Sequence, residues 1–365
     1  MSEGSGQARI RVLVVDDSPV MRELLVYLLV ADPGIQVVGT SSNGEEAIDA
    51  VRDKRPDVVA MDYHMPKMNG MEATRKIMES HPVPIVIVSG SSARDEVAAA
   101  FRLLEAGALA VVEKPVGINH PRYEAAAREL VQTVKLMAEV KVVRRWPRRE
   151  TAVAAARLRP ATQPRRAQEE MKLVAMGAST GGPVVLKAIL SALPKNFPAP
   201  ILIVQHIATG FTAGLVEWLA QSSAVPVHVA APGQRLLPGH VYVAPDGFHM
   251  KLAKDSTIAL GADAPESGHR PSVSHLFRSV AAALGRSAVG VLLTGMGKDG
   301  TEELKLMKDA GAVTIAQSEA SCVVPGMPGE AIQLGAATYI LPPERIAETL
   351  ATLFPGAARQ PDGSD

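Results

Sequence analysis

The sequence predicts an α/β protein built from two doubly wound domains, each with a parallel sheet. Short β-rich runs alternate with amphipathic stretches in both halves of the 365 residues. Alternation of strands and helices produces parallel sheets covered by helices. A stretch of different composition separates the halves, and a chain of this length suits two domains better than one.

The first half contains five β-rich runs with helical stretches between them. The first helical stretch opens with Ser18 and Pro19, a favourable N-cap and first-turn pair. Ligands of doubly wound sheets bind at the carboxyl ends of the strands, so we expect a site there. The predicted strands are residues 11–15, 35–39, 57–61, 84–88 and 108–112.

The alternation returns from Met171 onward. The dipeptide Pro238-Gly239 precedes two runs, at 241–245 and 249–253, that predict a β-hairpin. The remaining predicted strands of this half are residues 172–176, 200–204, 225–229, 288–293 and 312–316.

A basic stretch lies between the halves. From residue 141 to 168 there are nine basic residues and a single acid, Glu150, a net charge of +8. Its three prolines interrupt any long helix, and like charges keep such a segment open, which predicts a solvated linker. A docking strip for acidic partners is the alternative. The predicted domains are residues 1–130 and 169–355, with the linker at 131–168 and a flexible tail at 356–365.

The overall composition excludes several classes of protein. The formal net charge is zero, which gives no argument for nucleic acid or an anionic membrane. Cys322 is the single cysteine, so no intrachain disulfide forms. The apolar run 24–31 is far shorter than the roughly 20 residues of a membrane helix, and no apolar signal segment is evident. We expect a soluble cytoplasmic protein that is not inserted in a membrane.

Acidic and polar residues follow the predicted strands of the first half. Asp16 and Asp17 follow the first strand, Asp62 the third, Ser89 the fourth and Lys114 the fifth. Clustered carboxylates repel one another unless a hard cation such as Mg²⁺ lies among them. Metal charge, a lysine and a hydroxyl around an acceptor carboxylate are what phosphoryl transfer requires. Acids that merely cap helices are the alternative.

The motifs around these residues resemble a response-regulator receiver domain over about residues 10–130. They are VVDDSP (14–19), MDYHMPKMNG (61–70), VSG (88–90) and EKP (113–115). The resemblance implies a flavodoxin-like fold, with Asp62 as phosphoryl acceptor and with Ser89 and Lys114 sensing the phosphoryl group. It also implies that Asp16, Asp17, Asp62 and the main-chain carbonyl of His64 hold Mg²⁺.

The receiver motifs depart from the family in one respect. The family often has a switch aromatic on the fifth strand, where this chain has Ala110 and Val111. Phe101 is the aromatic residue near that place, so the aromatic part of the phosphorylation relay is expected to differ.

A possible nucleophile follows the first strand of the second half. Residues 177–181 match G-x-S-x-G, whose small residues permit a sharp strand-to-helix turn that exposes a serine, here Ser179. Glycine-rich turns also bind phosphates. A dinucleotide site would need G-x-G-x-x-G and an acid about 20 residues on. The glycine spacing differs, and His206 follows the next strand instead.

A serine nucleophile needs a base and an acid. His206 follows the second strand of this half, and Asp299 lies just beyond strand 288–293. If these strands are parallel neighbours, Ser179 attacks, His206 takes its proton and Asp299 orients the imidazole. The alternative bases, His249 and His269, follow no predicted core strand. No H-E-x-x-H spacing occurs, so we expect no metal or other cofactor in this site.

The segment 171–353 resembles the catalytic domain of the chemotaxis protein-glutamate methylesterases. The resemblance implies a Rossmann-like domain with Ser179, His206 and Asp299 as the triad. It also implies the Met296 N–H in the oxyanion hole and Thr180 beside the nucleophile. Ser274 stands where many relatives have an acid. The matching stretches are MGASTGG (176–182), QHI (205–207), GHVYVAP (239–245), HRPSV (269–273), TGMGKDG (294–300) and SCVVPGMP (321–328).

Together the two resemblances imply a phosphorylation-activated esterase. Its expected substrates are glutamate γ-methyl esters of chemoreceptors, with glutamine deamidation as a further activity, and its expected phosphodonor is a chemotaxis histidine kinase. The unphosphorylated receiver is expected to cover the Ser179 cleft. One alternative is a phospho-dependent docking module with little catalysis. Another is the same enzyme in a chemosensory pathway that controls gliding, development or surface behaviour rather than flagellar swimming.

Overall fold

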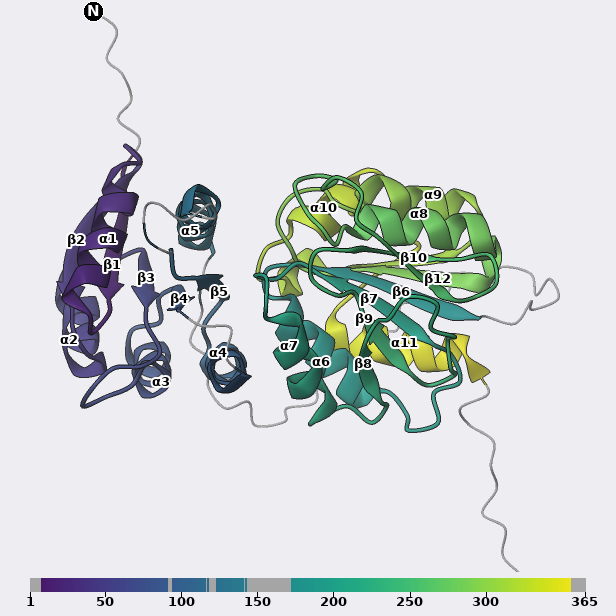
Figure 1. Ribbon diagram of the computed structural model, residues 1–365, viewed down its shortest axis with the longest axis horizontal. Coiled ribbons are helices and arrows are strands. Elements are labelled where there is room, and N and C mark those ends of the chain that lie inside the picture. The colour runs from purple at the N-terminus through teal and green to yellow at the C-terminus, as the bar shows by residue number, and fades with distance from the viewer. Residues whose placement is uncertain are drawn as a thin grey trace, which may run out of the picture.

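The protein forms two α/β bodies that pack against each other. The computed structural model describes residues 8–90, 94–115, 117, 123–140, 142 and 172–355. The first body, purple to blue, lies beside the second, teal to yellow, and presents α4, α5 and the edge strand β5 of its sheet to the second body (Figure 1). Most of the predicted linker and the whole predicted tail lie outside the described residues.

The first domain is a parallel sheet in the order β2-β1-β3-β4-β5. This is the flavodoxin-like order, and all five predicted strands are confirmed. Its strands are β1 (Ile10–Val15), β2 (Ile35–Ser41), β3 (Val58–Met61), β4 (Ile85–Ser89) and β5 (Ala110–Glu113). Its helices are α1 (Pro19–Val30), α2 (Gly44–Lys54), α3 (Gly70–Ser80), α4 (Arg94–Ala106) and α5 (Tyr123–Ala138).

Buried apolar side chains alternate across this sheet. Leu13 and Val15 of β1 pack on the side of α2, α3 and α4, whereas Val12 and Val14 pack toward α1 and α5. The helices begin where polar caps permit, for example at Ser18, whose Oγ accepts from the main-chain N–H of Met21. The helix α5 continues past residue 130, and its last turns still pack in the receiver core. The predicted domain boundaries themselves stay predictions.

The second domain also has a parallel sheet, in the order β14-β13-β12-β6-β7-β9-β8. Its strands are β6 (Leu173–Ala178), β7 (Ile201–Gln205), β8 (Val227–Val229), β9 (Val241–Val243), β10 (His249–Leu252), β11 (Ile258–Gly261), β12 (Ala288–Leu292), β13 (Val313–Gln317) and β14 (Tyr339–Leu341). Its α-helices are α6 (Gly182–Ala192), α7 (Thr212–Ala220), α8 (Val273–Leu284), α9 (Thr301–Asp309), α10 (Gly326–Gln333) and α11 (Pro343–Leu353).

The second domain contains a β-hairpin as predicted, but different strands form it. The strand β9 does not pair with β10; it lies between β7 and β8 in the parallel sheet. The antiparallel pair is β10 with β11, in the register His249 to Gly261. All of Val241, Tyr242 and Val243 are buried, as expected for a strand covered on both faces rather than for one arm of a surface hairpin.

The order of the strands creates a switch point at the centre of the second sheet. From β6 the chain continues to β7 on one side and later returns to β12 on the other side. Helices α8, α9 and α10 cover one face, and α6, α7 and α11 cover the other (Figure 1). Loops that follow β6 and β12 therefore meet at the carboxyl edge, where doubly wound sheets bind ligands.

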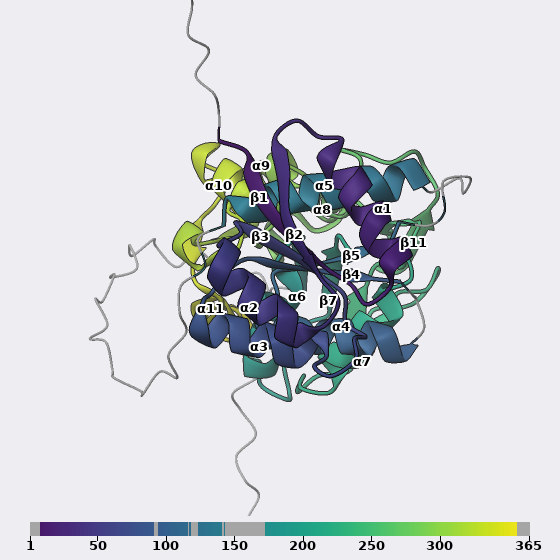
Figure 2. The ribbon, with the colours of Figure 1, turned by 90° about the vertical axis from the view of Figure 1, so that its left-hand side faces the viewer.

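The receiver contacts the second domain through α4. The ring of Phe101 on α4 stacks on Trp218 of α7, with centroids 5.2 Å apart and planes 22° apart. Lys187 of α6 pairs with Glu105 of α4 and also lies over the Trp218 ring. The view along the receiver shows α4 in front of α7 (Figure 2). Phe101 is therefore a domain-contact residue, and no aromatic side chain lies on β5.

Candidate active site and phosphorylation site

The turn after β6 places Ser179 at the centre of the carboxyl edge. Its main-chain N–H donates to the carbonyl of Thr294 (3.0 Å), and its own carbonyl accepts from Gly182 (2.8 Å). Gly181 has φ +79°, a left-handed conformation that favours glycine. The loop after β12 also lies close, since a Cβ on Gly295 would lie 2.6 Å from the Cβ of Ser179. The glycines of both loops therefore permit the close approach of backbone to the serine.

His206 and Asp299 meet beside this serine. The Nε2 atom of His206 lies 2.9 Å from Oδ2 of Asp299. The carboxylate accepts, so Nε2 carries the proton and Nδ1 is the basic nitrogen. Nδ1 is buried and has no hydrogen-bond partner among the described residues. Ser179 and His206 line one cavity, which leaves Nδ1 as the nitrogen that can accept the serine proton.

Asp299 is held by donors from the loop that begins α8. Its Oδ2 accepts from the N–H of Val273 (2.7 Å), and its Oδ1 accepts from Ser272 Oγ (2.8 Å) and the N–H of Ser274 (3.0 Å). Burial alone would raise the pKa of Asp299, but the hydrogen bonds and His206 outweigh it and hold the pKa well below its ordinary value. Asp299 is thus ionised and fixed in orientation.

His269 lies flat against the ring of His206. The two imidazoles are stacked, with centroids 3.8 Å apart and planes 7° apart. Burial, followed by the proximity of His206, lowers the pKa of His269 to about 4. His269 is therefore neutral near pH 7 and cannot repel a protonated His206. The sequence indicated His269 only as an alternative base, whereas the structure shows its ring packed on that of His206, the predicted base.

Two polar residues that the sequence did not single out hold the site together. Gln205 Nε2 lies 2.8 Å from the carbonyls of both Ser179 and His206. Thr294 Oγ1 lies within hydrogen-bond distance of the carbonyls of Thr180 and Val324. A signal for Gln205 was present, because it is the one polar residue in the buried run ILIVQ of β7. Buried polar groups of this kind require partners.

The predicted oxyanion donor, Met296, and Thr180, which was predicted to lie beside the nucleophile, both border the space around Ser179. Thr180 and Met296 line the same cavity as Ser179. Within the described part of the chain, neither main-chain N–H donates to another protein group, whereas the neighbouring N–H of Gly295 donates to Val324. Free N–H groups beside a nucleophile can stabilise a tetrahedral oxyanion.

Ser274 links Glu303 to the loop that carries Asp299. Its Oγ donates to Oε2 of Glu303 (2.7 Å) and accepts from the N–H of Gly300 (3.0 Å), next to Asp299. Glu303 in turn pairs with Arg278 at 2.7 Å. A carboxylate is therefore present at this place, but it comes from α9 rather than from position 274.

The receiver forms one wall of the active-site cavity. The cavity has a volume of about 400 Å³ and contains Ser179 and His206 on the catalytic side. Its receiver side comes from the C-terminal half of α4, from β5 and its preceding residue, and from α5. These residues are Phe101, Leu104, Leu109, Ala110, Val111, Val112, Glu129, Gln132, Thr133 and Leu136. The cavity that contains the serine thus lies between the two domains.

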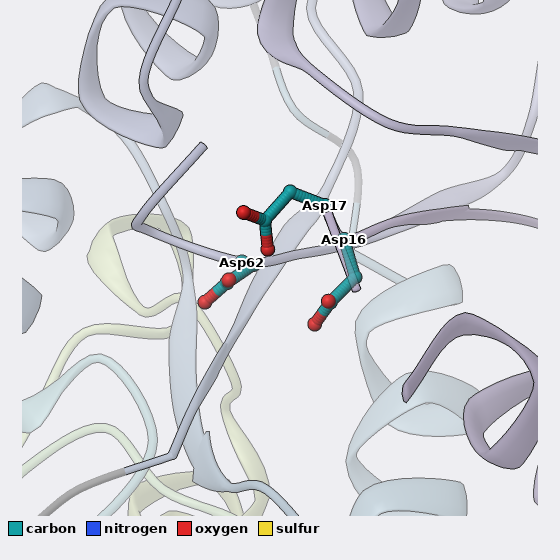
Figure 3. Close-up of side chains that lie close together, drawn as sticks. All are labelled: Asp16, Asp17 and Asp62. Atoms are coloured by element: carbon teal, nitrogen blue, oxygen red, sulfur yellow. The ribbon is translucent and has the colours of Figure 1, made fainter. Parts of the chain in front are cut away.

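The acidic residues of the receiver also gather at one edge of their sheet. Oxygen atoms of Asp16, Asp17 and Asp62 lie within 4.8 Å of one another, with the three carboxylates facing a common space (Figure 3). Lys114 Nζ lies 2.8 Å from Asp16 and 2.9 Å from Asp62. Ser89, the last residue of β4, is buried beside them, and its carbonyl accepts from the N–H of Lys114 (2.7 Å).

The electrostatics of this cluster suit a divalent cation. Burial raises the pKa of Asp62, and the negative charge of Asp16 raises it further. Lys114 lowers it, but by less, so the pKa stays above its ordinary value. Burial would lower the pKa of Lys114, but its pairs with the two aspartates raise it. Three close carboxylates with one lysine leave excess negative charge, and carboxylate oxygens are the donors Mg²⁺ prefers. Asp17 and His64 line one surface hollow, which would leave the cation open to solvent and phosphodonor.

Comparison with known proteins gives the same two-part division. The sequence matches the family "CheB methylesterase" over residues 174–350 and "Response regulator receiver domain" over residues 12–122. "Protein-glutamate methylesterase/protein-glutamine glutaminase 4" of Geobacter metallireducens is 57% identical over 346 residues, which cover 94% of this chain and 99% of the relative. A protein-glutamate methylesterase/protein-glutamine glutaminase of Nitrosospira multiformis is 57% identical over 344 residues, covering 94% and 97%.

Solved structures include one of the Thermotoga maritima CheB methylesterase catalytic domain. It is 40% identical, covers 51% of this chain and 100% of its own, and has a TM-score of 0.49. On the sequence matches, the chain belongs to the protein-glutamate methylesterase/protein-glutamine glutaminase family, whose members join a receiver domain to a CheB methylesterase domain. Among the described residues, no helix has both the length and the apolar character needed to cross a bilayer.

Proposed function

We propose that this chain is a phosphorylation-activated methylesterase that hydrolyses γ-methyl esters of glutamate side chains on chemoreceptors. The observation that carries the proposal is the orientation of His206: Asp299 fixes its Nε2, its buried Nδ1 has no partner among the described residues, and the residue lines the same cavity as Ser179. Relatives that share 57% of the sequence are named for this activity and for glutaminase activity. We therefore include conversion of receptor glutamines to glutamates.

The acylation step follows from the roles of these groups. Ser179 Oγ attacks the ester carbonyl carbon while His206 Nδ1 takes its proton, and Asp299 stabilises the imidazolium that forms. The N–H groups of Thr180 and Met296 stabilise the oxyanion. The bond from the carbonyl carbon to the methoxy group then breaks, and His206 returns the proton so that methanol leaves.

Deacylation regenerates the serine. Water attacks the acyl-enzyme, His206 Nδ1 takes a proton from it, and the Ser179 Oγ leaves with that proton. The product is a glutamate carboxylate. A glutamine side chain follows the same path, with ammonia leaving in place of methanol. Gln205 and His269 act through His206, since the first holds its backbone and the second holds its ring.

Regulation follows from the position of the receiver. A receptor side chain must reach Ser179 from a helix, and the described arrangement places α4, β5 and α5 in its way. We infer that this is the inactive form and that phosphorylation of Asp62 weakens the contact of α4 with α7 and shifts the population toward an open form. Asp16, Asp17, Asp62 and the carbonyl of His64 would hold Mg²⁺, which supplies positive charge for the phosphoryl oxygens. Ser89 and Lys114 sense the phosphoryl group.

The cellular setting is part of the same proposal. A chemotaxis histidine kinase donates the phosphoryl group, the substrates are the cytoplasmic segments of methyl-accepting receptors, and the enzyme works in the cytoplasm without nucleic acid. Its role is sensory adaptation.

The direct test is methanol release from methylated receptor membranes. Wild type and Ser179→Ala are compared, each with and without a small-molecule phosphodonor and Mg²⁺. Release by the wild type alone, increased by the phosphodonor, supports both sites and their coupling. Absence of release in every condition, with receptor binding retained, would replace the proposal by a docking module.

A further inference from the structure

The cavity between the two domains has the volume of a binding site for a small molecule. It measures about 400 Å³, and sites for small ligands measure about 300–1,000 Å³. One turn of a helix with its side chains is about 5.4 Å long and about 10–12 Å wide, so it occupies roughly 400–600 Å³. A receptor helix of several turns therefore cannot enter, whereas a free small ester can.

The cavity communicates with solvent. Met296 is 44% exposed, and Glu129 is also exposed, yet both line the cavity. The base and nucleophile line the same space, and among the described residues the hydrogen bonds that hold His206 and Asp299 come from the catalytic domain. The receiver therefore limits the size of the substrate that can enter, while the hydrogen bonds that orient His206 and Asp299 remain intact.

The receiver wall also has a chemical character. Its apolar part, which includes Leu109, Val111 and Leu136, suits an uncharged acyl or alcohol group, and Gln132 and Thr133 add neutral polar groups. Of the described receiver residues that line the cavity, Glu129 is the acidic one. Partial desolvation of the carboxylate, followed by the nearby negative charge of Glu113, raises the pKa of Glu129. A second negative charge in this space is disfavoured.

We propose that the closed, unphosphorylated enzyme hydrolyses small uncharged esters in this cavity, and that Glu129 of the receiver selects against anionic ones. The inference rests on the proposed role of Ser179 as nucleophile. This activity would need neither a chemoreceptor nor phosphorylation, and residues of the receiver domain would form part of the substrate pocket.

The reaction uses the groups already described. Ser179 Oγ bonds to the acyl carbon, the bond from that carbon to the alcohol oxygen breaks, and the alcohol leaves with the proton from His206. Water then cleaves the acyl-enzyme and gives the free acid, so one ester and one water become one acid and one alcohol.

The probes are p-nitrophenyl acetate, which is neutral, and mono-p-nitrophenyl glutarate, which carries a carboxylate. Both are assayed with the full chain at pH 8, without phosphodonor. We expect turnover of the neutral ester by wild type and its loss in Ser179→Ala. The phosphodonor with Mg²⁺ is expected to change the neutral-ester rate by less than about threefold, while methanol release from receptor membranes rises much more.

Glu129→Gln tests the selectivity and keeps the size of the side chain. We expect kcat/KM for the anionic ester to rise roughly three- to tenfold, the order expected for removing one charge near another in a partly solvated site. The neutral ester should change less than about twofold. Glu124→Gln is the matched control, because Glu124 lies on the same helix but does not line the cavity and is paired with Arg128. Phosphodonor should abolish the effect of Glu129→Gln as the receiver moves away.

The outcomes separate the two proposals. If the closed enzyme shows no Ser179-dependent turnover of either ester while the activated enzyme releases methanol from receptors, the small-ester activity is refuted and the methylesterase proposal stands. If Glu129→Gln behaves like Glu124→Gln, the selectivity is refuted. If neither esters nor receptors are hydrolysed in any condition, the proposed function itself fails.

Discussion

Replacing Gly214 by alanine should force the two domains apart. Gly214 lies in α7 against α4 of the receiver, and a Cβ there would lie 2.2 Å from Cγ1 and 3.0 Å from Cβ of Val97. Ordinary carbon contacts are about 3.5–4.0 Å, so the helices must separate or Val97 must rotate. Within α7 itself, alanine is about 1 kcal/mol more favourable than glycine. The change therefore strains the domain contact without weakening the catalytic domain.

The magnitude follows from the cost of overpacking. Adding a methyl group to a closely packed contact costs about 1–3 kcal/mol. If that cost falls on the closed form alone, the open population rises about 5- to 150-fold while it remains the minor form. Methanol release from methylated receptor membranes without phosphodonor should rise by the same factor. The rate with saturating phosphodonor should stay near that of wild type.

Two variants control this experiment. Gly329→Ala adds the same methyl group to α10, where its nearest neighbour would be Glu319 Oε1 at 3.4 Å, an ordinary contact, and it should leave basal release unchanged. Adding Val97→Ala to Gly214→Ala removes the overlapping methyl groups and should bring basal release back toward wild type. Basal release that stays at the wild-type level in folded Gly214→Ala would show that α4 on α7 does not hold the enzyme closed.

Three further predictions concern the two sites. Asp299→Asn should lower kcat by roughly a thousandfold or more, because the tautomer of His206 is lost; a loss below tenfold in methanol release would contradict the triad. His269 has a pKa of about 4 in the folded chain against 6.5 unfolded, so the unfolded state binds the extra proton and stability falls as pH drops from 6.5 to 4, by about 3 kcal/mol at most. His269→Gln should flatten that part of a urea-unfolding pH profile, and an unchanged slope would refute the assignment. Chelation of Mg²⁺ by EDTA should abolish stimulation by phosphodonor and leave basal release unchanged, and stimulation that survives would place no cation at Asp16 and Asp62.

The elements of both sheets were predictable because buried strands carry continuous apolar runs. The strand β3, VVAM, is buried at every position, and such runs bounded by polar residues define parallel strands. The hairpin was misplaced because 241–245 and 249–253 are neighbouring β-rich runs that follow the turn-forming Pro238-Gly239. Pairing of β9 with β7 and β8 depends on residues distant in the chain, which local turn chemistry does not specify. The short β14 was not predicted, since Tyr339 and Ile340 are exposed.

The candidate site residues that directly follow strands were predictable, because the end of a strand fixes where the next residue lies. Ser179, His206 and Asp299 each follow a parallel strand near the switch point, so topology alone brings them to one edge. Neither Gln205 nor Glu129 could be assigned a role in the same way. The first was hidden within an apolar strand, and the second lies on the outer side of a helix in the other domain.

The sequence by itself determined which chemical groups exist and on which strand ends they stand, because periodicity and turn residues act over a few positions. Only the tertiary structure decided which nitrogen of His206 faces Asp299, that a neutral His269 lies against that ring, and that Glu129 reaches the catalytic cavity. Those facts depend on how side chains from distant elements share a limited space. The packing of each side chain depends on contacts throughout the molecule, so a local sequence pattern does not predict it.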